Sequence, residues 1–305
     1  MNEKHSILFL VPYFGEWPPW LGHFLNSCRE NPSFSWVLIS DAPKPVNLPG
    51  NVNWYPADLE EISEKVSEII GKRVQITHPY KICDYRPAFG EIFKDLIGDH
   101  PFWGYNDLDI ILGDVKKFLT PERLERYDVF SVRKNYMTGH FAVYRNIPMI
   151  NRLFWKIPGV KKVFFRTGLH YALDERSRIA GKPLERNPFP AWYNSMRYHF
   201  KHIFGNPVRD MTTLLQSLEK KGEVRWFHKD LVRSDKWFSD RNVMEWEVLW
   251  EKGKLYDLTN NEELLHFHFL LSKREPVFLK NINTPSSRFV ISRQGILPVD
   301  QSSKL

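Results

Sequence analysis

Residues 102–115 read FWGYNDLDIILGDV, an apolar, strand-like run that contains Asp107 and Asp109. Acidic side chains are costly to bury without a partner. In an extended chain, residues two apart point to the same side, so the two carboxylates would share a face. Two close carboxylates repel each other unless a cation lies between them. The stretch therefore predicts a strand that leads to a divalent metal, Mg²⁺ or Mn²⁺, with a solvated turn as the alternative.

The sequence before this stretch alternates between strand and helix signals. Short apolar runs predict strands, and apolar residues at helical spacing predict helices. The clearest helix has Asp58 as its N-cap, Glu61 three residues later and Gly71 as its stop. Such alternation is typical of an α/β fold with a mostly parallel sheet, helices on its flanks and ligands at the strand ends. The predicted strands are 6–14, 35–41 and 51–57, and the predicted helices are 20–30, 58–71 and 87–97.

The rest of the chain extends this fold. Residues 147–209 form a basic, aromatic segment that we expect to be a helical and irregular insertion on the acceptor or membrane side. A polar tail after residue 285 is expected to be loosely ordered. We expect a single α/β domain over residues 1–305 with a C-terminal β extension. The remaining predictions are helices at 120–127 and 210–222, strands at 128–133, 139–146, 223–233 and 264–271, and a hairpin at 245–258.

The composition restricts the class of protein. The chain has 305 residues, of which 42% are hydrophobic, enough for a full core. Its two cysteines, Cys28 and Cys83, form no disulfide framework and no CxxC metal motif, which fits a reducing compartment. The first residues have too short an apolar core for a signal peptide, and no run reaches the roughly 18 apolar residues of a membrane span. We expect a cytoplasmic protein, soluble or held on a membrane surface.

The net charge of +7 is concentrated in one segment. Between Arg152 and Arg209 there are twelve Lys or Arg residues and three acids, an excess of nine positive charges. Aromatic residues such as Trp155 and Phe165 are interleaved with them. This pattern occurs in proteins that bind nucleic acid and in those that contact an anionic membrane, and a solvated helical face is a third interpretation. We favour the membrane surface over nucleic acid.

A second pair of candidate ligands lies near the C-terminus, in LLHFHFLL at residues 264–271. His266 and His268 are two apart, so both would lie on one face of a strand, opposite apolar residues. Neutral imidazole is a common ligand of divalent transition metals, and a histidine near the aspartates would favour Mn²⁺ over Mg²⁺. The alternative is two ordinary histidines at the surface or in the core.

Five stretches of the sequence match a known family when they are taken together. They are PYFGEWPPW (12–20), PYKICDYRPAFGEIF (79–93), FWGYNDLDIILGD (102–114), GHFAVYRN (139–146) and HFHF (266–269). They resemble the GT-A type of nucleotide-sugar glycosyltransferase, and most of all glycosyltransferase-like proteins from bacterial surface-polysaccharide loci. The resemblance implies a Rossmann-like, nucleotide-binding sheet with a metal at the aspartate pair. Asp107 would contact the metal or the donor ribose, Asp109 would be the main metal ligand, and His268, in preference to His266, would complete the site.

The same resemblance implies residues for donor binding. The end of the first strand would lie beside the base, Asp41 would contact the base or ribose, and a cation from the second stretch would lie near the phosphates. Gly139 and His140 would contact the donor sugar or the acceptor. For Asp41 and Lys81 the alternative is a solvated loop, and for Gly139 an ordinary glycine at the start of a strand. The full set of donor-binding candidates is Pro12, Tyr13, Phe14, Asp41, Lys81, Asp84, Arg86, Asp107, Gly139 and His140.

Asp174 and Glu175 are the candidates for a catalytic carboxylate, because they are two of only three acids in the basic segment. An inverting transferase needs a base that takes the proton from the acceptor hydroxyl, whereas a retaining transferase does not. Nearby cations would keep such a carboxylate ionised. The alternative is a surface ion pair between Asp174 and Arg178, four residues later.

The sequence therefore predicts a metal-dependent glycosyltransferase of the hexosyltransferase type. The donor would be a nucleotide diphosphate sugar, with UDP favoured, and the acceptor a glycan or lipid-linked glycan of bacterial surface polysaccharide synthesis at the inner face of the cell membrane. One rival is another metal-dependent nucleotide enzyme, such as a nucleotidyltransferase or phosphodiesterase, although neither a GxxxxGK[ST] nor a GxGxxG motif occurs. The other is a non-catalytic glycan-binding module, which would bind its ligand without metal.

Overall fold

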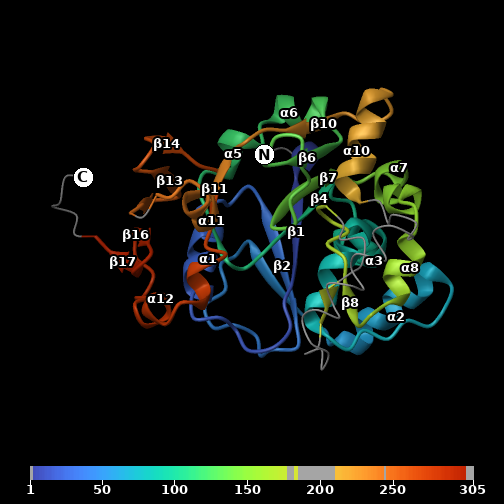
Figure 1. Ribbon diagram of the computed structural model, residues 1–305, viewed down its shortest axis with the longest axis horizontal. Coiled ribbons are helices and arrows are strands. Elements are labelled where there is room, and N and C mark those ends of the chain that lie inside the picture. Colours follow the sequence, from blue (N-terminus) through green and yellow to red (C-terminus); the bar gives the residue numbers. More distant parts are fainter. Residues whose placement is uncertain (1–2, 177–181, 185–209, 244, 300–305) are drawn as a thin grey trace.

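The computed structural model describes residues 3–176, 182–184, 210–243 and 245–299. Its centre is a seven-stranded sheet in the order β10-β6-β7-β4-β1-β2-β3 (Figure 1). All neighbours in it are parallel except the two pairs that β7 makes with β4 and β6. The predicted α/β class with a mostly parallel sheet is confirmed. The strands are β1 (Ile7–Pro12), β2 (Ser35–Ser40), β3 (Val52–Pro56), β4 (Phe102–Asn106), β6 (Val129–Ser131), β7 (Phe141–Arg145) and β10 (Trp226–His228).

Helices cover both faces of this sheet, so its central strands are buried on both sides. In β1, Ile7 and Phe9 belong to one apolar cluster and Leu8 to the other. This double burial explains why the strand is a continuous apolar run and not an alternating one. One cluster is closed by α1 (Leu21–Arg29), α5 (Val115–Phe118) and α6 (Pro121–Arg126). The other is closed by α2 (Leu59–Ile70), α3 (Phe89–Ile92), α4 (Lys94–Ile97), α7 (Pro148–Asn151), η3 (Leu153–Lys156), α8 (Val160–Phe165) and α10 (Met211–Lys220).

Local signals place the ends of several helices correctly. The Asp58 side chain accepts a hydrogen bond from the Glu61 backbone N–H, and Gly71 ends α2 with a positive φ of 72°. The helix predicted at 87–97 is different, because Pro79–Ala88 form a 3₁₀ helix, η2, that leads into the short α3 and α4. Pro87 lies inside η2, and because proline has no backbone N–H it cannot continue an α-helical hydrogen-bond ladder.

A second, three-stranded sheet has the order β11-β15-β5. It is formed by β5 (Ile110–Leu112), β11 (Val232–Ser234) and β15 (His266–His268), with β15 antiparallel to β5 and parallel to β11. The predicted strand that leads to the aspartate pair is present as β4, but the pair itself does not lie in an extended strand, since the chain leaves the central sheet after Asn106, bends, and enters β5 at Ile110. The strand predicted at 223–233 is likewise divided between the two sheets, as β10 and β11.

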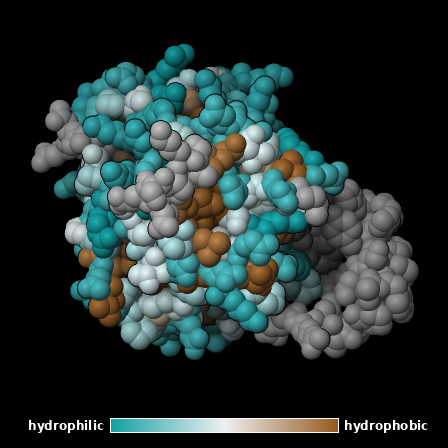
Figure 2. Space-filling view, turned by 90° about the vertical axis from the view of Figure 1, so that its left-hand side faces the viewer, coloured by the Kyte–Doolittle hydropathy of each residue, from teal (hydrophilic) through white to brown (hydrophobic). Residues whose placement is uncertain are grey.

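The C-terminal part adds a five-stranded antiparallel sheet, which confirms the predicted β extension. The expectation of a loosely ordered tail is wrong up to residue 299, because Phe289, Ile291 and Ile296 are buried in an apolar cluster. The side of the molecule that carries this sheet is largely hydrophilic, with scattered hydrophobic residues (Figure 2). The helices and strands of this C-terminal part are α11 (Asp235–Ser239), β12 (Val248–Glu251), β13 (Lys254–Asp257), β14 (Glu262–Glu263), η4 (Ser272–Arg274), α12 (Pro276–Lys280), β16 (Arg288–Ser292) and β17 (Gly295–Pro298).

The basic segment is described in part. As predicted, residues 147–176 are helical and irregular, and they include a short strand, β8 (Leu169–His170), that pairs with β9 (Lys182–Pro183). The remainder of the predicted 147–209 insertion, residues 177–181 and 185–209, lies outside the described residues. No helix within the described ranges has the length and apolar character needed to cross a membrane.

Candidate metal and donor site

The aspartate pair lies on the bend between β4 and β5, where the chain passes from one sheet to the next. The Asp107 backbone N–H donates to the His140 carbonyl oxygen at 3.1 Å, which fixes the bend against the start of β7. Asn106 also stabilises this bend. Its side chain accepts a hydrogen bond from the Trp36 indole N–H at 3.0 Å and donates one to the Asp107 carbonyl oxygen at 3.0 Å. Sequence reasoning did not single out Asn106, whose role depends on a tryptophan two strands away.

Asp107, Asp109 and His268 converge, with one ligand atom from each lying within 4.8 Å of the other two. The antiparallel register between β5 and β15 pairs His268 with Ile110, so its imidazole lies beside Asp109. The His268 Nε2 atom is 3.1 Å from Asp109 Oδ2, and both side chains are buried. Two carboxylates and an imidazole are a donor set suited to a divalent transition metal such as Mn²⁺, so the chain's own residues fit the predicted ion.

Two cationic side chains engage the same carboxylates. The Lys273 ammonium pairs with Asp109, and the Arg86 guanidinium pairs with Asp107. Burial acts to raise the pKa of Asp109, but His268 and Lys273 outweigh it and hold this pKa well below its ordinary value. Burial raises the pKa of Asp107 despite Arg86, and the charge on Asp109 raises it further. Asp109 is therefore the permanent negative charge of the site.

The two predicted histidines have different surroundings. His266 is fully buried, and its Nε2 atom lies 3.0 Å from His140 Nδ1. Burial holds the pKa values of His266 and His140 well below the ordinary value, and the neighbouring His268 lowers them further. Both rings are therefore neutral, and they pack next to the candidate ligand, with the His140 and His268 ring centroids 4.6 Å apart. Within the described residues, the three-residue ligand group contains His268 and not His266.

Arg86 connects this group to the predicted catalytic acids. Its Nη1 atom is 2.9 Å from Asp174 Oδ2, while Nη2 pairs with Asp107. Next to Asp174, Glu175 accepts hydrogen bonds from the Gly139 backbone N–H at 2.8 Å and the Tyr136 hydroxyl at 3.2 Å. Four separate stretches of the sequence thus contribute to one continuous site, through Arg86, Asp107, Gly139 and the adjacent Asp174 and Glu175.

Gly139 is required by close packing in this site. A Cβ at this position would lie 2.7 Å from Asp174 Oδ2, 2.9 Å from Arg86 Nη1 and 2.9 Å from Glu175 Oε1. Such distances are shorter than any normal contact, so a larger residue would displace the acids. The alternative partner of Asp174, Arg178, lies outside the described residues.

The predicted nucleoside-binding residues lie at the adjoining ends of β1 and β2. The Tyr13 ring stacks on Trp17, with ring centroids 5.6 Å apart, and Asp41 Oδ1 accepts from the Gly15 backbone N–H at 2.7 Å. Pro12 is the last residue of β1, and Phe14 is buried in the core below. Burial raises the pKa of the Tyr13 hydroxyl, Lys273 opposes this rise, and the charge on Asp109 adds to it. Carboxyl ends of neighbouring parallel strands are the usual ligand-binding edge of such sheets.

Lys81 and Asp84 do not fit the predicted role in the donor pocket. Both side chains are fully buried, and the Lys81 ammonium is 2.8 Å from Asp84 Oδ2. Its other hydrogen bonds go to the Val163 and Leu169 carbonyl oxygens, at 2.9 Å each, so no donor is left for a phosphate. Asp84 in turn accepts from the backbone N–H groups of residues 171 and 173. The pair therefore anchors the segment that positions Asp174.

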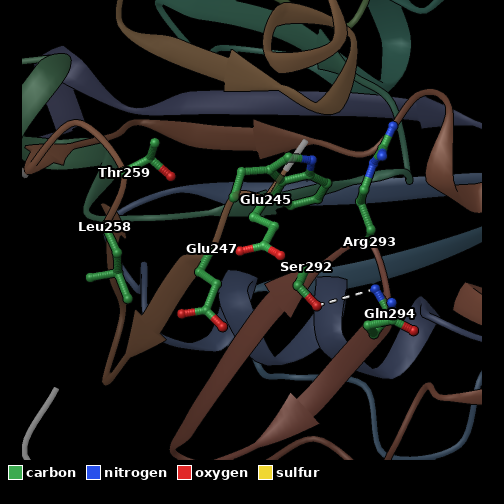
Figure 3. A pocket seen from close by; sticks show the side chains of 8 residues that line it. Glu245, Glu247, Leu258, Thr259, Ser292, Arg293 and Gln294 are labelled. Atoms are coloured by element: carbon green, nitrogen blue, oxygen red, sulfur yellow. Dashed lines mark hydrogen bonds between the residues drawn. The ribbon is translucent and has the colours of Figure 1, made fainter. Parts of the chain in front are cut away.

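A separate polar pocket of about 530 Å³ lies on the C-terminal sheet (Figure 3). Its walls come from the residues before β12, the residues after β13 and the turn between β16 and β17. None of these residues belongs to the ligand group at the aspartate pair. The lining side chains include Glu245, Glu247, Leu258, Thr259, Arg293 and Gln294.

Asp174 provides a test of the electrostatics of the site. Burial raises its pKa from 3.8 to about 7 although Arg86 opposes the shift, so the folded chain holds a proton that the unfolded chain has already released. This contribution to stability is complete below about pH 4 and is lost as the pH rises to about 7. In urea unfolding, the free energy of unfolding of wild type should therefore fall by roughly 1–4 kcal/mol relative to that of Asp174→Asn as the pH rises from about 4 to about 7.

The control is Asp99→Asn at an exposed loop, whose difference from wild type should be independent of pH in the same window. The free energy of unfolding of wild type could instead exceed that of Asp174→Asn by an amount that stays constant or grows with pH. This result would show that Arg86 keeps Asp174 ionised, and would contradict the assigned protonation.

Among the solved structures that are similar to this chain are two glycosyltransferases. The galactosyltransferase LgtC, in complex with donor and acceptor sugar analogues, has 10% sequence identity and a TM-score of 0.39, with 89% of this chain and 88% of that one covered. The mouse xyloside xylosyltransferase 1, in its apo form, has 10% identity and a TM-score of 0.43, with 88% and 99% covered. At these values the similarity establishes neither a shared reaction nor a shared ligand.

No curated protein matches the sequence. A family model does match residues 9–300, which is nearly the whole chain. Its description is a family of unknown function, DUF6625. The chain therefore belongs to the DUF6625 family.

Proposed function

We propose that this chain is a metal-dependent glycosyltransferase that uses a nucleotide diphosphate sugar as donor. The observation that carries the proposal is the convergence of Asp107, Asp109 and His268 within 4.8 Å beside two cationic side chains. One buried and one half-buried carboxylate, an imidazole and basic groups at the carboxyl edge of a parallel sheet are the chemistry that a metal-bound diphosphate needs. The sequence resemblance favours uridine as the base and Mn²⁺ as the ion.

Each part of the site has a role in this proposal. Asp107, Asp109 and His268 would hold the divalent cation, which supplies positive charge to the departing diphosphate. Lys273, and not Lys81, would provide the protein's cation near the phosphates, because its side chain is partly exposed beside Asp109, whereas that of Lys81 is fully buried. The stacked rings of Tyr13 and Trp17 would form the wall for the base, next to Asp41.

Of the two acids Asp174 and Glu175, Asp174 is the better candidate for a catalytic carboxylate. A pKa near 7 lets a carboxylate take up a proton from an acceptor hydroxyl at neutral pH and release it again. Both oxygens of Glu175 already accept hydrogen bonds, from Gly139 and Tyr136, so we assign Glu175 to positioning the start of β7. In a retaining reaction Asp174 would instead bind a hydroxyl of the donor sugar.

The acceptor in this proposal is a glycan or lipid-linked glycan of bacterial surface polysaccharide synthesis, reached from the cytoplasmic side of the membrane. Supporting residues lie on and beside α8, where Lys161, Lys162 and Arg166 are exposed. Lys161 lies over the Trp155 ring at 5.6 Å, and Phe165 is exposed with Lys72 over its ring at 5.1 Å. Basic side chains with adjoining rings suit an anionic headgroup layer.

The donor and the metal are tested together by thermal unfolding with a panel of nucleotide sugars, each with and without Mn²⁺. We expect one uridine-diphosphate sugar to raise the melting temperature only when Mn²⁺ is present, with roughly 2.7 kcal/mol of stabilisation at a hundredfold excess over Kd. Asp109→Asn should abolish this shift, and the exposed control Asp95→Asn should preserve it. Turnover should release a nucleoside diphosphate. Stabilisation that needs no metal and survives Asp109→Asn would contradict the proposal.

Membrane contact is tested by sedimentation with vesicles. Reversing Lys161, Lys162 and Arg166 to Glu should weaken binding to phosphatidylglycerol vesicles by at least about tenfold, since each basic residue near the surface contributes about 1 kcal/mol. Binding to neutral phosphatidylcholine vesicles should be weak for all proteins. A matched triple reversal at the exposed Lys44, Lys94 and Lys254 is the control. Equal loss in both triple variants, or no loss in either, would refute a specific contact through α8.

A further inference from the structure

Lys273 uses the oxygen that a metal would need. Its ammonium pairs with Asp109 Oδ2, the same atom that lies 3.1 Å from His268 Nε2. Asp109 is buried, whereas the Lys273 side chain keeps about 27% of its surface exposed. A compact ammonium with three donors and a divalent cation therefore compete for one carboxylate oxygen at the centre of the ligand group.

The backbone just before Lys273 is held by hydrogen bonds, and the Lys273 side chain is partly exposed. The Asp235 carboxylate accepts hydrogen bonds from the backbone N–H groups of Leu271, at 2.9 Å, and Ser272, at 2.6 Å. These hydrogen bonds hold the start of η4, and the partly exposed Lys273 side chain extends from this helix. Arg86 is different, because it is only 14% exposed and pairs with Asp107 and Asp174 at once. Of the two cations, Lys273 has the more exposed side chain and pairs with one carboxylate where Arg86 pairs with two.

We propose that Lys273 makes metal binding conditional on the diphosphate, by holding Asp109 until an anion is available to receive the ammonium. This inference rests on the proposed function and assigns a regulation to the same site. An ammonium beside a bound divalent cation is repelled by it, so free metal must displace Lys273 without compensation. A nucleotide diphosphate supplies negative charge to both cations and removes that penalty. Metal and nucleotide then bind cooperatively, and free metal binds weakly.

The test measures Mn²⁺ binding from the electron paramagnetic resonance signal of the free ion, with and without UDP, for wild type and Lys273→Met. Methionine keeps the length of the side chain and removes its charge. We expect Lys273→Met to bind Mn²⁺ alone about tenfold more tightly than wild type, and UDP to increase the Mn²⁺ affinity much less than in wild type. Lys273→Gln should behave in the same way, which guards against a folding defect of one variant. Lys280→Met, at an exposed residue of α12, is the control and should match wild type.

The outcomes separate this inference from the proposed function. If Mn²⁺ binds wild type in the presence of UDP and Asp109→Asn abolishes that binding, the result supports the proposed metal site. Unchanged or weaker binding of Mn²⁺ alone by both Lys273 variants would then overturn the inference and leave the proposed function intact. If Mn²⁺ binds neither wild type nor Lys273→Met in the presence of UDP, the proposed function fails and the inference fails with it.

Discussion

A buried carboxylate that must be neutralised determines the organisation of this site. Asp109 is almost inaccessible to solvent, and its charge is balanced by His268 and Lys273, which lie 159 and 164 residues later in the chain. Removing either partner leaves a charge that is costly to bury. The antiparallel pairing of β5 with β15 meets this requirement, because it brings the His268 imidazole beside the Asp109 carboxylate. The C-terminal part of the chain is thereby tied to the ligand-binding edge of the central sheet.

A second network extends the site toward the candidate acids. Arg86 joins Asp107 to Asp174, and the buried Lys81–Asp84 pair, only a few residues before it, fastens the backbone around residues 163–173. One short stretch, η2, thus both anchors the segment that ends at Asp174 and supplies the cation that faces it. The glycine at position 139 allows these groups to approach each other, since no Cβ fits between them. This arrangement supports our proposal that sugar transfer, and not only nucleotide binding, takes place at the site.

The sequence predicted features that depend on local signals. Buried parallel strands have continuous apolar runs, α2 has its cap and stop, and the spacing of Asp107 and Asp109 points to their shared chemistry. Features that depend on distant partners were missed or misread. A lysine in a polar turn, such as Lys273, carries no periodic signal, and Lys81 and Asp84, which were expected to line the donor pocket, form a buried ion pair. The division of residues 102–115 between two sheets could not be predicted either, because strand pairing and not propensity decides it.

The central claim is that Asp107, Asp109 and His268 bind one divalent cation together with a nucleotide diphosphate. Crystals grown with Mn²⁺ and UDP, measured on both sides of the manganese absorption edge, test it most directly. The account predicts a single strong anomalous peak within coordination distance of an Asp109 oxygen and His268 Nε2, with phosphate oxygens completing the shell. Ordered UDP without an anomalous peak between these three residues, or a peak bound by other side chains, would contradict it.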